Sequence, residues 1–129
     1  MATEGPLGEI ALQAVAMPKD ANVNGDIFGG WLMSHMDLAA AVIFRQRAHG
    51  PGALVACEAM EFHQPVFVGD LVSFHARIVR EGRTSMLIGV EAWARRMAYG
   101  EHVKVTEGGF TFVALDDDRR PKPLPEKGA

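Results

Sequence analysis

The sequence predicts an α+β domain in which one antiparallel sheet wraps around a central helix. Three observations indicate this fold class. A helical segment from about Gly29 to Arg47 is apolar on nearly every side, which is typical of a helix buried on most sides. One segment with the alternation of a strand precedes it, and four follow it. Because a single sheet leaves one flank of such a helix uncovered, we expect a partner chain there and at least a dimer.

Size and composition fit one domain. The chain has 129 residues, 48% of them hydrophobic and 22% charged, which is enough to bury one core. A formal charge of -3 gives no general attraction to nucleic acid. A single cysteine excludes an intramolecular disulfide. The longest apolar stretch, residues 38–44, is too short for a membrane span, and the N-terminus does not resemble a signal peptide. We therefore expect a cytoplasmic protein.

The first strand is expected over residues 10–16, ending near Met17. A turn-rich stretch, residues 19–26, leads to the helix, which residues 49–52 (HGPG) terminate. Charge and proline replace the apolar pattern from Asp116 onward. The expected organisation is a flexible N-terminus at 1–7, one domain at 8–115 and an extended C-terminal tail at 116–129.

Four strands are expected after the helix, at residues 54–62, 72–78, 86–94 and 103–115. In the last of them, Val103 and Val105 share one parity, whereas Phe110 and Phe112 share the other. Since Gly108 and its glycine neighbour lie between the two pairs, we expect a bulge there that resets the register.

Asp37 is the chemical anomaly of this sequence, because it lies in the middle of the apolar helix. An isolated carboxylate is costly to bury, so it needs partners, a raised pKa or access to a polar cleft. Gly30, Ser34, Asp37 and Ala41 fall in one stripe of small and polar residues, which leaves room for a ligand. The alternative interpretation is close packing against a partner chain.

The start of the helix has a chemical interpretation as well. Gly29 and Gly30 leave the first N–H groups unobstructed at the positive end of the helix dipole, where an oxyanion is stabilised. Asp37 would activate water or attack directly. Asp26 has either a catalytic role or a favourable electrostatic one near the helix N-terminus. Cys57 is expected to be a core residue.

Residues 17–37, MPKDANVNGDIFGGWLMSHMD, resemble the signature of YciA-type hot-dog acyl-CoA thioesterases. The similarity continues to about residue 125, with Met60-x-Phe62-x-x-Pro65, Gly82-Arg83-Thr84-Ser85, Val90-x-x-Trp93 and Phe110-x-Phe112. The resemblance implies the hot-dog fold and hydrolysis of acyl-CoA to free CoA and a carboxylic acid, as in fatty acid metabolism. It also implies no metal and no cofactor, since coenzyme A is part of the substrate. Dimers would assemble into trimers of dimers, that is, a hexamer.

By the same resemblance, Asp37 is the catalytic acid, and the oxyanion-binding backbone is at Gly29 or Gly30. The acidic or amide position before the helix falls on Asp26 or Asn24, and the two carboxylates of one site can come from different chains. The positions expected to bind substrate or line the CoA channel are Asn24, Ser34, Arg83, Thr84, Ser85 and Thr106.

This chain differs from the family pattern at His35, which replaces an amide, and at residues 107–109 (EGG). The acyl-chain preference therefore stays open. The alternative function is a non-catalytic acyl-CoA or acyl-carrier binding module, because one fold hosts several functions. A hydratase would need a histidine paired with the aspartate, and His35 does not supply that geometry.

Overall fold

The computed structural model describes residues 5–127, so most of the N-terminal segment expected to be flexible, residues 1–4, lies outside the described residues, as do residues 128–129. Its elements are β1 (Glu9–Val15), the 3-10 turn η1 (Pro18–Asp20), α1 (Gly29–Ala48), β2 (Gly52–Phe62), β3 (Leu71–Glu81), β4 (Ser85–Arg95), the 3-10 turn η2 (Arg96–Ala98) and β5 (His102–Ala114). The predicted order of one strand, one helix and four strands is confirmed.

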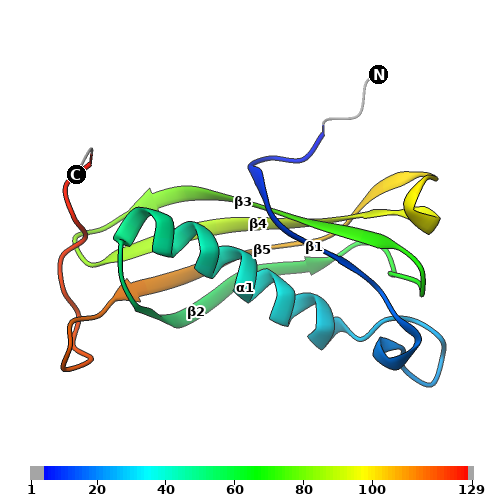
Figure 1. The fold of residues 1–129 in the computed structure, drawn as a ribbon, viewed down its shortest axis with the longest axis horizontal. Helices are drawn as coiled ribbons and strands as arrows, with labels where there is room; N and C mark the ends of the chain where they lie inside the picture. Colours follow the sequence, from blue (N-terminus) through cyan, green and yellow to red (C-terminus); the bar gives the residue numbers. More distant parts are fainter. Residues whose placement is uncertain (1–4, 128–129) are drawn as a thin grey trace.

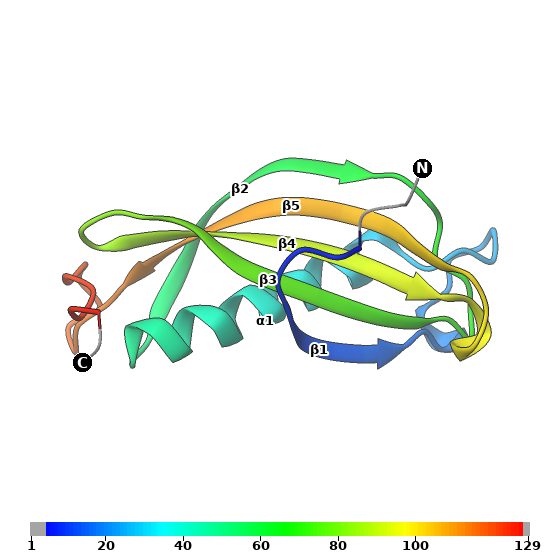
Figure 2. The same ribbon diagram turned by 90° about the horizontal axis from the view of Figure 1, so that it is seen from above.

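The five strands form one sheet in the order β1-β3-β4-β5-β2, and every neighbouring pair is antiparallel. α1 lies across one face of this sheet (Figure 1). After the helix, the chain returns as β2 to the edge beside β5, so β1 and β2 form the two edges of the sheet (Figure 2). The predicted sheet around a central helix is confirmed.

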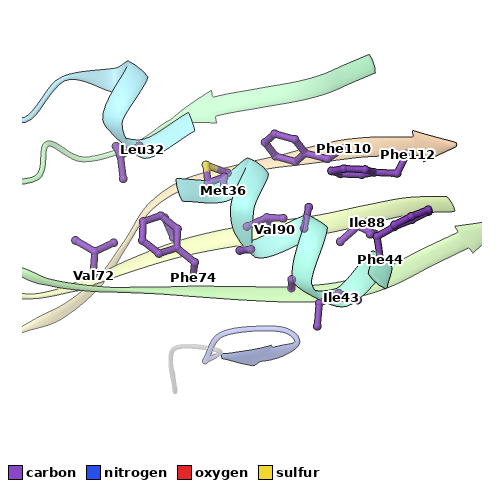
Figure 3. Close-up of a cluster of buried hydrophobic side chains, with 14 of the residues drawn as sticks. Leu32, Met36, Ile43, Phe44, Val72, Phe74, Ile88, Val90, Phe110 and Phe112 are labelled. Atoms are coloured by element: carbon purple, nitrogen blue, oxygen red, sulfur yellow. The ribbon is translucent and has the colours of Figure 1, made fainter. Parts of the chain in front are cut away.

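The core fills the space between α1 and the sheet (Figure 3). Each large apolar side chain buried there contributes about 1.5–3 kcal/mol. The Phe44 ring of the helix stacks on Phe112 of β5, with 5.3 Å between the ring centroids. Other large members include Leu32, Met36 and Ile43 from α1 and Val72, Phe74, Met86, Ile88, Val90 and Phe110 from the sheet.

One flank of α1 and the neighbouring edge strand are left uncovered, as the apolar pattern of the helix predicted. Leu38 is 57% exposed on α1, and Val55 is 58% exposed on β2. Cys57 is exposed as well, so the expectation of a core cysteine was wrong. Cys57 is exposed because β2 is an edge strand, and this chain does not cover it. Within residues 5–127, no helix is both long enough and apolar enough to cross a membrane.

The register of β5 changes, but not where the sequence suggested. Gly108 and Gly109 pair regularly with β4. The register shift lies between two neighbouring β4 residues, Ala92 and Trp93, which pair with Thr106 and Lys104 of β5. Val105 is therefore the extra residue, and it is buried together with Thr106. The prediction of a bulge at the glycines was wrong in its position, because the change of parity occurs before them.

The glycines of β5 accommodate an irregularity in the neighbouring strand instead. β2 has a register shift between Glu58 and Glu61, with Ala59 at a φ of 53°. A Cβ on Gly108 would lie 2.1 Å from the sulfur of Met60. The absence of a side chain at Gly108 thus lets Met60 pack over β5.

The C-terminal segment lies along the β3–β4 hairpin. The Lys122 N–H donates to the Ala114 carbonyl and the Leu124 N–H to the Arg83 carbonyl, both at 2.9 Å. Leu124 also packs against the core. These contacts join the tail to the end of the molecule where α1 finishes.

Candidate active site

The first turn of α1 offers free N–H donors. The N–H groups of Gly29 and Gly30 have no acceptor within the helix, as in the first turn of any α-helix, and the preceding residue, Phe28, makes no side-chain capping hydrogen bond to them. Within residues 5–127, a Cβ placed on Gly30 would meet nothing within 4 Å, whereas one placed on Gly29 would lie 3.6 Å from the Phe62 ring. A ligand oxygen can therefore approach the start of the helix at Gly30, with the Phe62 ring beside Gly29.

The loop before α1 is held by the side chain of Asn22. Its Oδ1 accepts hydrogen bonds from the N–H groups of Asn24 (2.9 Å) and Asp26 (3.2 Å). Gly25 supports this turn with a φ of 88°, a conformation that favours glycine. Asp26 then forms an isolated antiparallel bridge with Phe67. These bonds fix Asp26 just before the helix and leave Asn24 exposed.

Asp26 and Gly29 share a cavity of about 360 Å³ at the start of the helix. The segment that follows β2 forms the opposite wall, including Phe62 and His63. Asn24 does not line this cavity, so the structure brings Asp26, rather than Asn24, together with the helix N-terminus. The other lining residues are Asn22, Ile27, Leu32, Gln64, Pro65 and Val66.

Asp37 lies in the middle of α1 and is partly exposed. Its carboxylate is therefore not isolated in the core, and this partial exposure lowers the cost of keeping the charge. Asp37 is close enough to β2 to act on Cys57 of that strand. The pKa of the Cys57 thiol is raised first by burial and secondly by the Asp37 carboxylate. Ser34 in the same stripe is exposed, and its hydroxyl donates to the Trp31 carbonyl at 3.0 Å. Asp37 thus faces the uncovered flank of the helix.

The remaining predicted residues lie in two other places. Arg83, Thr84 and Ser85 are at the β3–β4 hairpin, at the opposite end of the molecule from the start of α1 (Figure 2). Thr106 lies opposite Phe62 on the β2–β5 ladder. It is fully buried, and its hydroxyl has no hydrogen-bond partner within the described part of the chain.

The N–H donors at the start of α1 and the Asp37 carboxylate are far apart along the helix. Gly30 and Asp37 are seven residues apart, which corresponds to about 10 Å at 1.5 Å per residue. An oxyanion donor must lie about 3 Å from the oxygen that it stabilises. One chain alone therefore cannot easily apply both groups to the same carbonyl.

Sequence reasoning missed the cavity wall formed by Phe62 and His63, and a polar group on the other face of the sheet. There the Lys104 hydrogen bond lowers the pKa of Glu107, whereas burial lowers the pKa of His102. The sequence signal for this polar group on the other face was the alternation Glu61-x-His63, which places both side chains on one side of a strand.

A five-stranded antiparallel sheet around one long helix defines a hot-dog-fold protein, and here the helix carries an acidic residue in its middle. The sequence profile of the Thioesterase superfamily matches residues 24–100. The acyl-CoA thioester hydrolase YciA of Salmonella typhimurium is 48% identical over 126 residues, with 95% of each chain covered.

Solved structures agree with this match. A hexameric thioesterase from Yersinia pestis is similar with a TM-score of 0.90 at 44% identity, covering 94% of this chain and 98% of that one. An aspartate-to-alanine mutant of a hexameric broad specificity acyl-coenzyme A thioesterase also gives 0.90, at 42% identity and with coverage of 94% and 89%. The chain belongs to the thioesterase superfamily and, within it, to the YciA-type acyl-CoA thioester hydrolases.

Proposed function

We propose that this protein hydrolyses acyl-CoA thioesters to free CoA and a carboxylic acid. The observation that carries the proposal is the presence, on one helix of a member of this family, of an accessible carboxylate at Asp37 and exposed glycines, Gly29 and Gly30, in the first turn. A cytoplasmic location is part of the same proposal.

The separation of about 10 Å along α1 favours a site built from two chains. We propose that β2 pairs antiparallel with β2 of a second copy about a two-fold axis. The uncovered flanks of the two helices would then lie side by side in opposite directions, with the N-terminus of one beside Asp37 of the other. The exposed edge strand supports this arrangement, because unpaired edges are templates for pairing with another chain.

Three such dimers would form the hexamer, the assembly of the two solved relatives. The same two-fold axis would bring Arg83, Thr84 and Ser85 of one chain toward the helix N-terminus of the other. That end of the site is where the CoA part of the substrate would lie. Thr106, which is fully buried and lies opposite Phe62 on the β2–β5 ladder, would act on the shape of the cavity rather than touch CoA directly.

The reaction needs one base and one oxyanion site. A water oxygen bonds to the thioester carbon while its proton passes to the Asp37 carboxylate. The carbonyl electrons move onto oxygen, where the N–H of Gly29 or Gly30 stabilises the charge. The C–S bond then breaks, and the CoA sulfur leaves with the electron pair and takes the proton from Asp37.

A second route starts with attack of the Asp37 carboxylate on the thioester carbon, which expels CoA thiolate and leaves a mixed anhydride. Water then hydrolyses the anhydride. A single turnover in ¹⁸O-water, followed by mass spectrometry of the Asp37 peptide, detects an anhydride that water opens at the aspartyl carbon, because only this route puts label into the Asp37 carboxylate. Label in the released acid alone fits the general base or an anhydride that water opens at the acyl carbon, and chemical trapping of the anhydride separates these two.

Free thiol release from a panel of acyl-CoAs tests the function. We expect turnover by the wild type and a loss of about a hundredfold or more in Asp37→Asn, since asparagine cannot serve as base or nucleophile. Asp117→Asn, at an exposed position of the C-terminal turn, is the matched control. Binding of CoA esters without turnover by the wild type would contradict the proposal and favour a binding module.

Asp26→Asn in the same assay separates its two interpretations. A catalytic carboxylate predicts a large loss of kcat, whereas an electrostatic role at the helix N-terminus predicts about 0.3–1 kcal/mol of lost stability with little change in kcat.

A further inference from the structure

On the sheet face opposite α1, three glutamates stand in one row across three strands. Glu107 of β5 pairs directly with Glu61 of β2 on one side and with Glu91 of β4 on the other. Like charges directly opposite each other destabilise a sheet. The Lys104 ammonium lies 3.0 Å from Glu107 and 3.6 Å from Glu91. A single ammonium thus serves two carboxylates, and it does not reach Glu61.

His63 lies beside two of these glutamates, Glu61 and Glu107, and adds an imidazole nitrogen to their carboxylate oxygens. Its Nε2 lies 2.7 Å from Oε2 of Glu107, and one donor atom each from Glu61, His63 and Glu107 falls within 4.8 Å of the others. His63 is fixed after the end of β2 by its backbone N–H, which donates to the Val105 carbonyl at 2.8 Å. Two carboxylates and an imidazole are the ligands that Zn²⁺ and similar ions accept.

Lys104 does not occupy the atoms that such an ion would use. It binds Oε1 of Glu107, whereas Oε2 of the same carboxylate points to His63. Carboxylates that bind metals are commonly oriented by a hydrogen bond from a second residue. Lys104 can therefore hold Glu107 in position while Oε2 accepts the ion.

We propose that Glu61, His63 and Glu107 bind one divalent transition-metal ion of the Zn²⁺ class on the outer face of the sheet. Glu61 and Glu107 are separate from Asp37, which lies on the helix at the other face of the sheet, whereas His63 is shared with the wall of the cavity beside Gly29. The ion joins the end of β2 to β5. It also fixes His63, which forms part of the wall of the cavity beside Gly29.

Calorimetric titration of Zn²⁺ and Ni²⁺ into chelator-treated, dialysed protein tests the site. A Cys57→Ser background removes the one thiol. We expect one ion per chain, with an affinity at least about tenfold weaker in His63→Ala and in Glu107→Gln. Glu58→Gln on β2 and His49→Ala after α1, both exposed positions, are matched controls that retain full affinity.

Thermal unfolding provides a second readout, since an ion that binds only the folded state raises Tm. Zn²⁺ should raise the Tm of the background protein and of both controls, but not that of His63→Ala. No saturable binding at one ion per chain, or equal affinity in the His63 and Glu107 variants and the controls, overturns the proposal. Neither result bears on acyl-CoA turnover, which is measured separately with Asp37→Asn.

Discussion

The pKa of the Cys57 thiol is raised by burial and, secondly, by the carboxylate of Asp37, which places the middle of α1 beside the edge strand β2. Cys57 pairs with the core residue Phe110, so its side chain is on the helix side of β2, and its sulfur is partly covered although the residue as a whole is exposed. A proposed catalytic group and the proposed dimer edge are therefore neighbours.

This proximity predicts a change in thiol reactivity. Asp37→Asn removes a negative charge beside Cys57, so the pKa of the thiol falls and more thiolate is present at a given pH. We expect faster alkylation by iodoacetamide at pH 8 in the variant than in the wild type. Mass spectrometry of the intact protein gives the rate, and Asp117→Asn should leave it unchanged. Equal rates in all three proteins would show that Asp37 does not act on the thiol.

Introducing a charge on β2 should separate the proposed dimer. In Val55→Lys, an ammonium replaces an exposed apolar side chain on the edge strand, and pairing there would bury it. We expect a monomer in light scattering and loss of thiol release, because the proposed site is built from two chains. Val79→Lys, at an exposed position of β3, should remain at least a dimer. A fully assembled Val55→Lys protein would exclude β2 as the interface.

The fold, and the position of Asp37 on the buried helix, were predictable from sequence because both depend on local pattern. Strand alternation and the apolar helix gave the element order, and Asp37 stood out as a carboxylate within that helix. The exposure of Cys57 and the bulge at Val105 were not predictable in this way. They depend on which strand lies at the edge and on how β5 pairs with two neighbours, and both pairings join residues far apart in the chain. The contact of His63 with Glu107 was missed for the same reason.

An ion pair beside the loop that follows β2 should be important for stability. Asp70 is 1% exposed, and its carboxylate pairs with Arg96 and accepts the Phe67 N–H at 2.9 Å. Asp70→Ala leaves these donors without their acceptor, so we expect a loss of about 2–4 kcal/mol in the free energy of unfolding. Urea denaturation measures it. Asp117→Ala should change stability by less than about 0.5 kcal/mol, and a similar small change at position 70 would contradict the assignment.

His102 predicts a loss of stability on the acid side of neutrality. Burial, then the charges of Arg95 and His75, lower its pKa from 6.5, and the carboxylates of Glu91 and Glu101 line the same cavity. The unfolded chain binds a proton at a higher pH than the folded chain does. Stability from this group is thus complete above pH 6.5 and is lost as pH falls through the lower, folded-state pKa.

Urea midpoints between pH 5 and pH 7.5 test this prediction. His102→Gln should show a shallower decline than the wild type below pH 6.5, whereas His49→Gln, an exposed histidine after α1, should follow the wild type. A variant curve parallel to that of the wild type would assign the decline to other groups.

Gly30 allows catalysis and stability to be separated at one position. A Cβ added there meets nothing within 4 Å, so Gly30→Ala fits the fold. Alanine in place of glycine in a helix stabilises by roughly 0.5–1 kcal/mol. In the proposed mechanism, the same methyl group would stand where the thioester oxygen approaches the N–H groups of the first turn. Impaired contact with one oxyanion donor costs up to about 10²–10³ in kcat.

We therefore expect Gly30→Ala to have an equal or higher Tm than the wild type and at least about tenfold lower kcat. Gly50→Ala at the other end of α1 is the control, because a Cβ there meets only the end of the Lys122 side chain, at 3.8 Å. A Gly30→Ala enzyme with full kcat would mean that the carbonyl does not dock at the start of α1. A lowered Tm with lowered kcat would instead indicate that this glycine acts through folding.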